Sequence, residues 1–250
     1  MTIFMDKQKR DKLRRCQSIA VAAAIITAIL VNTPAATAAV GEPAYAGAFS
    51  GAPIPAEIIF RQSADAVFLL ETFDSKGESI RTGSGFFISE DGLAATNLHV
   101  LDEAASATIT LYNGEVYPVR GVNAKSEEHN LAIISIDSDA GGWDYLPLGN
   151  SDRVEVGNSV YTIGSPLGLI NTMTAGIVSN TKRDVDGNIL IQFTAPISFG
   201  SGGTALLDTL GRVVGVASSS FSYGQNLNLA VPVNHLKAMK AGECVPLGKP

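Results

Sequence analysis

The chain has 250 residues, 46% of them hydrophobic and 17% charged, and a formal net charge of −6. This length suits one sizeable domain or two small ones. The acidic balance, with no basic run beyond residue 15, argues against a nucleic-acid partner.

The N-terminal segment has the layout of a secretory signal. A basic block is followed by an apolar run at 19–31 and by small residues, with cleavage patterns at 36–38 and 44–46. We predict a signal peptide over 1–38, extending to 46 if the second pattern is used. The product would be exported to a bacterial periplasm or beyond the cell. The alternative is a membrane anchor through 19–31, but this run spans only about 20 Å as a helix, short of a ~30 Å bilayer core.

Removal of residues 1–38 leaves 12 basic and 22 acidic residues. Cys244 is then the single cysteine, and the histidines show no metal-type spacing. The sequence therefore predicts no disulfide, no metal and no cofactor.

The remaining elements indicate an all-β protein. Residues 39–55 are rich in small residues, Gly and Pro and predict a flexible lead-in. Pro55 can begin a short helix, and β-branched and aromatic residues follow from Ala66. Turn signals recur at 74–78, 89–92, 112–115, 184–188 and 208–212 between short apolar segments, as in a sandwich or barrel. A late helix is predicted over 233–242, closed by Gly242, and 241–250 form a tail.

Several segments in order carry a family resemblance: "GSGFFISEDGLAATNLHV", "LPLGNSDRVEVGNSVYTIGSPLG", "GRVVGV" and "NLNLAVPVNHL". Over about residues 56–240 the chain resembles the trypsin-like protease domain of the HtrA (high-temperature-requirement A) family. The resemblance implies two packed six-stranded β-barrels, 56–137 and 147–240, with short helices at both ends and an active site between the barrels. Family members often carry a PDZ domain after the protease; none is expected before Pro250.

The resemblance implies a catalytic histidine at His99, in "TNLHV" after a strand. The third triad member falls on Asn130, where the family has Asp. Asparagine can orient an imidazole but has no charge to stabilise an imidazolium. His129 and His235 lack such a context, and we interpret them as a loop residue and a helix-surface residue.

The nucleophile loop lies in "APISFGSGGTALLD" (195–208) and allows more than one alignment. Without gaps, Gly200 takes the place of the oxyanion glycine and Gly202 stands where the serine is expected. With "SGG" kept intact, Ser201 is the nucleophile and Gly202 and Gly203 follow it. Thr204 is a third candidate. We predict Ser201, because it is the only serine in the glycine-rich turn.

The resemblance also implies a substrate pocket near Ala217, Ser218 and Ser219, which are small and uncharged. A small or medium apolar residue is expected before the cleaved bond. The predicted function is a secreted serine endopeptidase acting on unfolded or extended polypeptides. The alternative is a catalytically silent or very weak member that binds peptides in the same cleft. Family members commonly form trimers, so a homo-oligomer is a further expectation.

Overall fold

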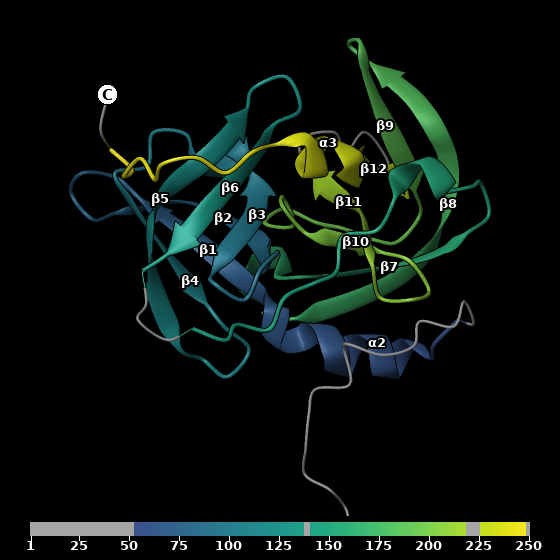
Figure 1. The fold of residues 1–250 in the computed structure, drawn as a ribbon, viewed down its shortest axis with the longest axis horizontal. Coiled ribbons are helices and arrows are strands. Elements are labelled where there is room, and N and C mark those ends of the chain that lie inside the picture. Colours follow the sequence, from purple (N-terminus) through teal and green to yellow (C-terminus); the bar gives the residue numbers. More distant parts are fainter. Residues whose placement is uncertain (1–52, 138–140, 219–225, 249–250) are drawn as a thin grey trace, which may run out of the picture. The chain divides into compact units, whose positions relative to one another are not determined.

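The computed structural model describes residues 53–137, 141–218 and 226–248, which belong to one compact unit, Phe49–Pro250. In this part the strands close into two six-stranded barrels (Figure 1). The first barrel has the hydrogen-bonded order β1-β2-β3-β6-β5-β4, and the second has β10-β11-β12-β9-β8-β7. Their bounds are β1 Val67–Phe73, β2 Ser79–Phe87, β3 Leu93–Asn97, β4 Ser106–Thr110, β5 Val116–Ser126, β6 Leu131–Ile136, β7 Ser159–Gly164, β8 Thr172–Val185, β9 Asn188–Phe193, β10 Ala205–Leu207, β11 Val213–Ser218 and β12 Asn228–Pro232.

Short helices lie at both ends of the described segment, so the predicted all-β, two-barrel architecture is confirmed. They are α2 Ala56–Ser63 and α3 Val233–Ala238, and the 3-10 turns are η1 Ala64–Ala66, η2 Leu98–Leu101, η3 Ser151–Arg153 and η4 Pro166–Gly168. Pro55 precedes the first turn of α2, as predicted, and Ile59 of this helix is fully buried.

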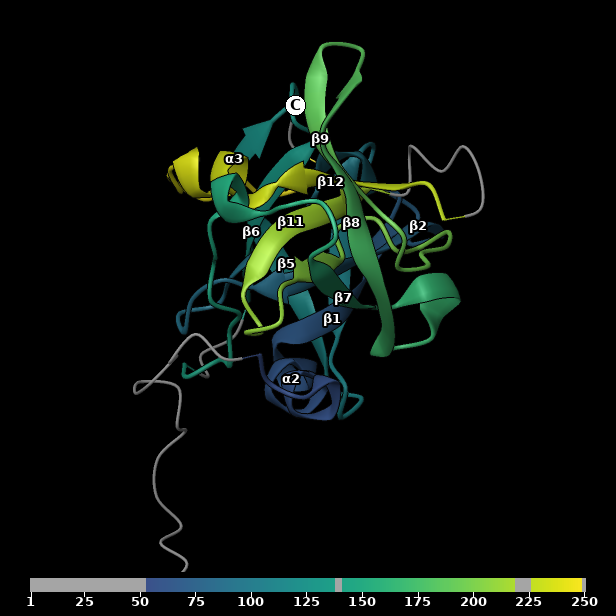
Figure 2. The same ribbon diagram turned by 90° about the vertical axis from the view of Figure 1, so that its right-hand side faces the viewer.

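The hairpin turns follow from local sequence. Between β8 and β9, Asp186 and Gly187 have φ values of 52° and 86°. Two successive positive φ values are those of a turn that matches the twist of the flanking strands. Figure 2 shows the resulting hairpin projecting beyond the rest of the second barrel.

Buried side chains form three clusters: one inside each barrel and one shared between the barrels. Phe86 and Phe87 show how a run of apolar residues serves two of them. Successive side chains of a strand point to opposite faces, so Phe87 packs inside the first barrel and Phe86 in the shared cluster, both fully buried. Leu131 of β6 and Val216 of β11 join the shared cluster from opposite barrels.

Ser84 of β2 links the two barrels through polar contacts. Its N–H donates to the carbonyl of Gly202 at 2.8 Å, and its Oγ lies 3.1 Å from the carbonyl of Gly200. The N–H of Ser165, after β7, donates to the same Oγ at 2.8 Å. Because Ser84 is fully buried, these bonds are shielded from competing water.

The late helix is shorter than predicted. It ends at Ala238, and Met239 is already extended (φ −71°, ψ 138°). Gly242 does not cap it; its N–H donates to the carbonyl of Asn123 on β5 at 2.8 Å. Backbone bonding to the first barrel draws the chain away from the helix axis, which the local sequence does not reveal.

The predicted signal and most of the predicted lead-in lie outside the described residues. Within the described ranges no helix is long and apolar enough to cross a membrane.

Gly203→Ala is expected to destabilise the fold strongly. The added Cβ would lie 2.2 Å from the Ser84 carbonyl oxygen and 2.6 Å from Thr96 Oγ1, at a φ of +89°. Left-handed strain costs about 1–2 kcal/mol and overpacking about 1–3 kcal/mol, so urea unfolding should show a loss of about 3 kcal/mol. Gly187→Ala is the matched control, with φ +86° and no atom within 4 Å of the new Cβ. Equal losses in the two variants would show that the contacts of Gly203 do not matter.

Candidate active site

His99 lies where β3 passes into η2, at the boundary of the two barrels. The N–H of Leu98 and the side-chain amide of Asn97 both donate to the carbonyl of Asn130, each at 3.1 Å. These bonds tie the end of β3 to the turn before β6. Burial is the largest cause of a lowered His99 pKa, and the hydrogen bond with Asn130, followed by the carboxylate of Asp102, opposes it. At neutral pH the imidazole is therefore held uncharged.

Asn130 contacts both the backbone and the ring of His99. It adopts a left-handed conformation (φ 51°), which asparagine tolerates better than most residues. Its Oδ1 accepts the backbone N–H of His99 at 2.9 Å. Its Nδ2 lies 2.9 Å from Nδ1 of the ring, and Oδ1 lies 3.2 Å from the same atom.

The backbone contact decides which way the amide faces. A backbone N–H can only donate, so Oδ1 is fixed on that side and Nδ2 makes the shorter contact with the ring. An amide nitrogen also only donates, so the shorter 2.9 Å contact assigns the acceptor role to Nδ1 and the ring proton to Nε2, whereas the 3.2 Å contact of Oδ1 suits the opposite tautomer. A base that takes a proton from serine needs a free Nε2. The assigned Nε2–H tautomer does not provide it.

Ser201 lies in a tight turn in which its backbone N–H and its Oγ are both hydrogen-bonded to Ser198. The residue is 2% exposed. Its Oγ accepts the N–H of Ser198 at 3.2 Å, and its N–H donates to the Ser198 carbonyl at 3.0 Å. Within the described residues no hydrogen bond joins Ser201 to His99. An acyl-enzyme at Ser201 would also need this N–H for the oxyanion, so this turn would have to open. The assignment of Ser201 as nucleophile stays a prediction.

Gly200 and Gly202 offer two free backbone donors in the same loop. Among the described residues, the N–H groups of Gly200 and Gly202 have no acceptor. The carbonyls of the preceding peptides are engaged: Phe199 O accepts from Leu167 at 2.9 Å, and Ser201 O from Thr204 at 3.1 Å. Because both peptides are trans, each free N–H points away from its pinned carbonyl. The loop therefore carries two unpaired backbone donors, the kind of group that an oxyanion site uses.

The structure brings this loop to the elements that carry His99. A Cβ on Gly203 would lie 3.1 Å from the backbone nitrogen of Asn97. A Cβ on Gly83 of β2 would lie 3.1 Å from the Gly202 carbonyl and 2.8 Å from Val100 of η2. His99, Asn130 and the loop 198–204 thus share one region of the boundary between the barrels.

The predicted pocket residues lie at the end of β11. Ala217 is fully buried in the cluster inside the second barrel, and its carbonyl accepts the N–H of Gly203 at 3.0 Å. Ser218 is 1% exposed, and its Oγ has no partner among the described residues. Ser219 lies outside the described residues. Their role as a substrate pocket stays a prediction.

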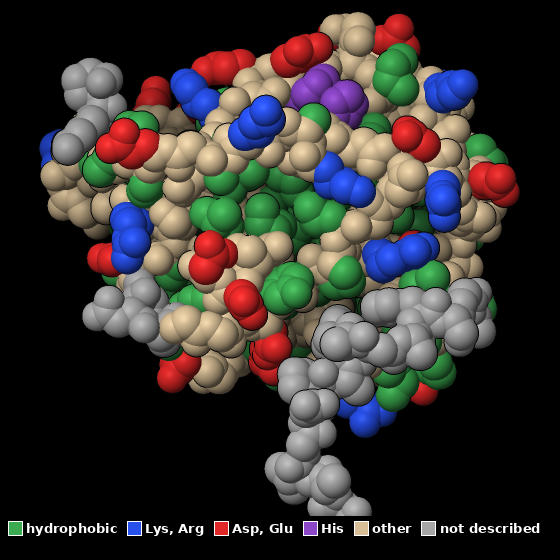
Figure 3. All heavy atoms as spheres, viewed as in Figure 1, with side chains coloured by type: hydrophobic (Ala, Val, Ile, Leu, Met, Phe, Trp, Pro, Cys, Tyr) green, Lys and Arg blue, Asp and Glu red, His purple; other side chains and the backbone are tan. Residues whose placement is uncertain are grey.

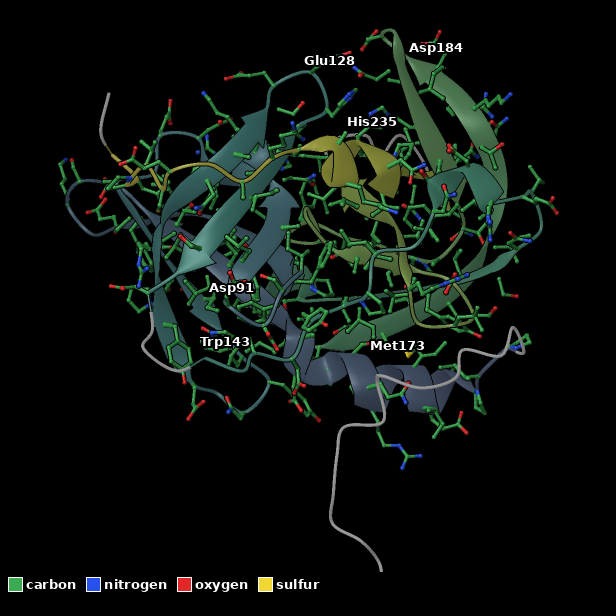
Figure 4. All side chains as sticks on the ribbon, in the orientation of Figure 1. Asp91, Glu128, Trp143, Met173, Asp184 and His235 are labelled. Carbon is green, nitrogen blue, oxygen red and sulfur yellow. The ribbon has the colours of Figure 1, made fainter. Side chains whose placement is uncertain are left out.

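His129 and His235 form a contact that sequence reasoning missed. Their ring centroids lie 3.8 Å apart, joining the turn before β6 to α3, and both side chains are partly buried. His129 lies in a turn and His235 on a helix, as predicted, and the sequence did not reveal the contact between them. Figure 3 shows histidine side chains side by side near the top of the view, and Figure 4 places Glu128 above His235. No motif signals the pair, because only the docking of the barrels brings the rings together.

The first prediction from this geometry concerns the tautomer of His99. Long-range ¹⁵N–¹H NMR on the chain should show the Nε2–H form, because Asn130 donates to Nδ1. Asn130→Asp should move the proton to Nδ1 and raise the pKa of the ring, because a carboxylate accepts and stabilises the imidazolium. The His235 signals serve as the internal control. An Nδ1–H tautomer in the unaltered chain would contradict the assigned amide orientation.

The second prediction concerns pH. Burial, followed by the charge of His129, lowers the pKa of His235 below its ordinary value of 6.5, while Glu128 opposes this. The unfolded chain therefore takes up protons first on acidification, and stability present above pH 6.5 is lost as the pH falls through the lowered folded pKa. His99 contributes with the same sign. Urea unfolding between pH 5 and 8 should show that the free energy of unfolding changes less steeply with pH in His235→Asn than in the natural chain. An unchanged slope would exclude His235 as a contributor.

Comparisons with known proteins agree with this fold. The trypsin-like peptidase domain family matches residues 83–216. A Synechocystis protein named serine protease HhoA is 33% identical over 177 residues, 66% of this chain and 44% of that protein. Proteins named periplasmic serine endoprotease DegP-like from Chlamydia trachomatis and Chlamydia pneumoniae are 36% and 38% identical over 146 and 151 residues. These matches span 56% and 58% of this chain and 28% and 30% of the relatives, so the chain corresponds to less than half of each protein. The chain therefore belongs to the trypsin-like serine peptidase family, as a domain of the HtrA/Deg type.

Proposed function

We propose that this chain binds extended polypeptides in the protease cleft and, in its natural form, cleaves them very slowly or not at all. The observation that carries this proposal is the 2.9 Å contact between Asn130 Nδ2 and His99 Nδ1. This contact keeps the ring proton on Nε2. A free lone pair on that atom would be needed to accept the proton of a serine hydroxyl. Replacing the triad Asp by Asn in a serine protease lowers kcat by about 10⁴ through the same change of tautomer.

The loop 198–204 supports binding without hydrolysis. The free N–H groups of Gly200 and Gly202 can hold a peptide carbonyl. In the gapless alignment position 202 is the nucleophile position, and glycine offers no hydroxyl there. Gly202 has no positive φ, whereas Gly200 and Gly203 have φ values of 84° and 89°. Position 202 therefore has a backbone that a residue with a side chain could adopt.

Exposed apolar side chains beside the loop indicate the class of polypeptide. Phe199 is 83% exposed, Leu167 71% and Leu169 63%. The bond from Leu167 N–H to the Phe199 carbonyl places two of them side by side. Leu167 also has a φ of 53°, a conformation that costs energy for leucine. Clustered exposed apolar residues mark interaction sites, so we infer that unfolded segments rich in apolar residues bind here.

A second candidate is a serine endopeptidase that uses Ser201, because the relatives above are named as serine proteases. In this mechanism Ser201 Oγ attacks the scissile carbonyl while His99 takes the hydroxyl proton. His99 then returns that proton to the leaving amine, and water hydrolyses the acyl-serine. Both bonds between Ser198 and Ser201 would have to break first, because they occupy the Oγ and the N–H of Ser201.

We further propose that the chain acts outside the cytoplasm. The N-terminal signal pattern supports export, and several relatives are named periplasmic. The partner would be a polypeptide and not a nucleic acid, and the chain would form a homo-oligomer as HtrA-type proteases commonly do.

One labelling experiment separates the two candidates. A fluorophosphonate probe reacts with a serine that a base activates. We expect no label on the natural chain or on Ser201→Ala, and strong label at position 202 in the double variant Gly202→Ser with Asn130→Asp. Gly202→Ser alone should label weakly, because His99 keeps the wrong tautomer. Label on the natural chain that disappears in Ser201→Ala would establish the endopeptidase instead.

Binding is measured separately, by fluorescence anisotropy with an unfolded casein-type peptide. Phe199→Ser with Leu167→Ser should weaken binding at least about tenfold, because two large apolar contacts are lost. Val156→Ser is the matched control, since Val156 is 64% exposed in the loop before β7. Equal affinity in all three proteins would refute the proposed binding surface.

A further inference from the structure

We propose that a cavity on the first barrel, lined by η2, β5 and the C-terminal tail of the chain, binds a second polypeptide segment. In this segment a lysine or arginine is flanked by apolar residues. This site goes beyond the proposed function, because none of its lining residues belongs to the loop 198–204.

The cavity has a volume of about 850 Å³, within the usual range of ligand sites. Leu98 and Leu101 of η2 line one side, together with Ala104. Val122 and Ala124 of β5 line another. Residues 245–248 of the tail complete it. The walls are therefore mostly apolar and can hold aliphatic side chains.

The tail is fixed to β5 by an isolated antiparallel bridge, and Figure 1 shows it as a coil that runs from α3 across to the first barrel. Val122 and Val245 exchange two backbone hydrogen bonds of 2.8 and 2.9 Å. Gly121 allows this approach, because a Cβ there would lie 2.3 Å from the Val245 carbonyl. One wall of the cavity is thus a built element of the fold.

The charged groups around the cavity are mostly acidic: Asp74, Asp102, Glu103 and Glu243, against Lys125. Lys125 is already paired with Glu127 at 2.9 Å, and Glu103 lies 3.7 Å from Arg81. Asp102 and Glu243 have no ion pair or side-chain hydrogen bond within the described residues. These two carboxylates are available to a cation.

The unpaired charged groups on the walls define the chemistry of the ligand. The carboxylates of Asp102 and Glu243 only accept hydrogen bonds, so a ligand that completes them must donate. Lysine and arginine are donor-only side chains whose aliphatic stems pack on apolar surfaces.

A ligand bound in the cavity would change the pKa of His99. η2 carries both His99 and the lining residues Leu98 and Leu101, and the charge of Asp102 raises the pKa of His99. A cation seated on Asp102 would offset this effect and lower the pKa of His99. The ring titration of His99 therefore reports binding at the cavity.

The test is an NMR titration of the full chain with the blocked tripeptide acetyl-Leu-Arg-Leu-amide, with acetyl-Leu-Glu-Leu-amide as the control. We expect saturable shifts at the amides of Leu98, Leu101 and Val122 with the arginine peptide only. Asp102→Asn with Glu243→Gln should weaken binding at least about fivefold. The matched pair Asp184→Asn with Glu155→Gln removes the same charge elsewhere and should change nothing; Figure 4 shows Asp184 near the tip of the β8–β9 hairpin.

A fall in the pKa of His99 on saturation, absent in Asp102→Asn with Glu243→Gln, would complete the case. Equal shifts with the glutamate peptide, or shifts confined to Gly200–Gly203, would overturn the proposal. The second result would show that the peptide uses the protease cleft alone, so it would leave the proposed function standing.

Discussion

Ser84 fixes the geometry on which the candidate site depends. Its N–H and Oγ engage the carbonyls of Gly202 and Gly200, its Oγ also accepts from Ser165, and its carbonyl accepts from Thr96 Oγ1 at 2.8 Å. With the bonds to Phe199 O and Ser201 O, four successive peptide planes of the loop are pinned. Two N–H groups are left free as a result. The donors are thus arranged before any ligand arrives, which is how a binding site avoids an ordering cost.

In the loop 198–204 the backbone donors of Gly200 and Gly202 are free, whereas the hydroxyl of Ser201 is hydrogen-bonded within the loop. The donors at Gly200 and Gly202 are present whether or not a nucleophile stands between them and His99. Catalysis also needs a hydroxyl in the right register and a base with a free Nε2. Under the proposed function, peptide binding and peptide cleavage are separable for this reason, and the amide of Asn130 bears on cleavage.

The sequence predicts the fold well because its signals are local. Asp-Gly and Asn-Gly pairs specify turns, and the apolar "GFF" run serves a strand that is buried on both faces. The end of α3 could not be predicted, because the bonding partner of Gly242 is Asn123, far away along the chain. The contact between the rings of His129 and His235 depends likewise on how the barrels dock. The position of Asn130 was visible in the sequence. The direction of its amide was not, because it depends on the backbone N–H of His99.

The shared cluster between the barrels has a consequence for how the protein opens. Each barrel has its own interior, and such an arrangement could melt in two steps. Here Phe86, Leu131 and Val216 pack in a common cluster, and Ser84 bonds across the same boundary. Exposing either interior therefore exposes part of the other barrel's apolar surface, which couples the two into one cooperative unit. A partly open form with one intact barrel would be a costly and short-lived species, and a folded chain would offer few such forms to surrounding proteases.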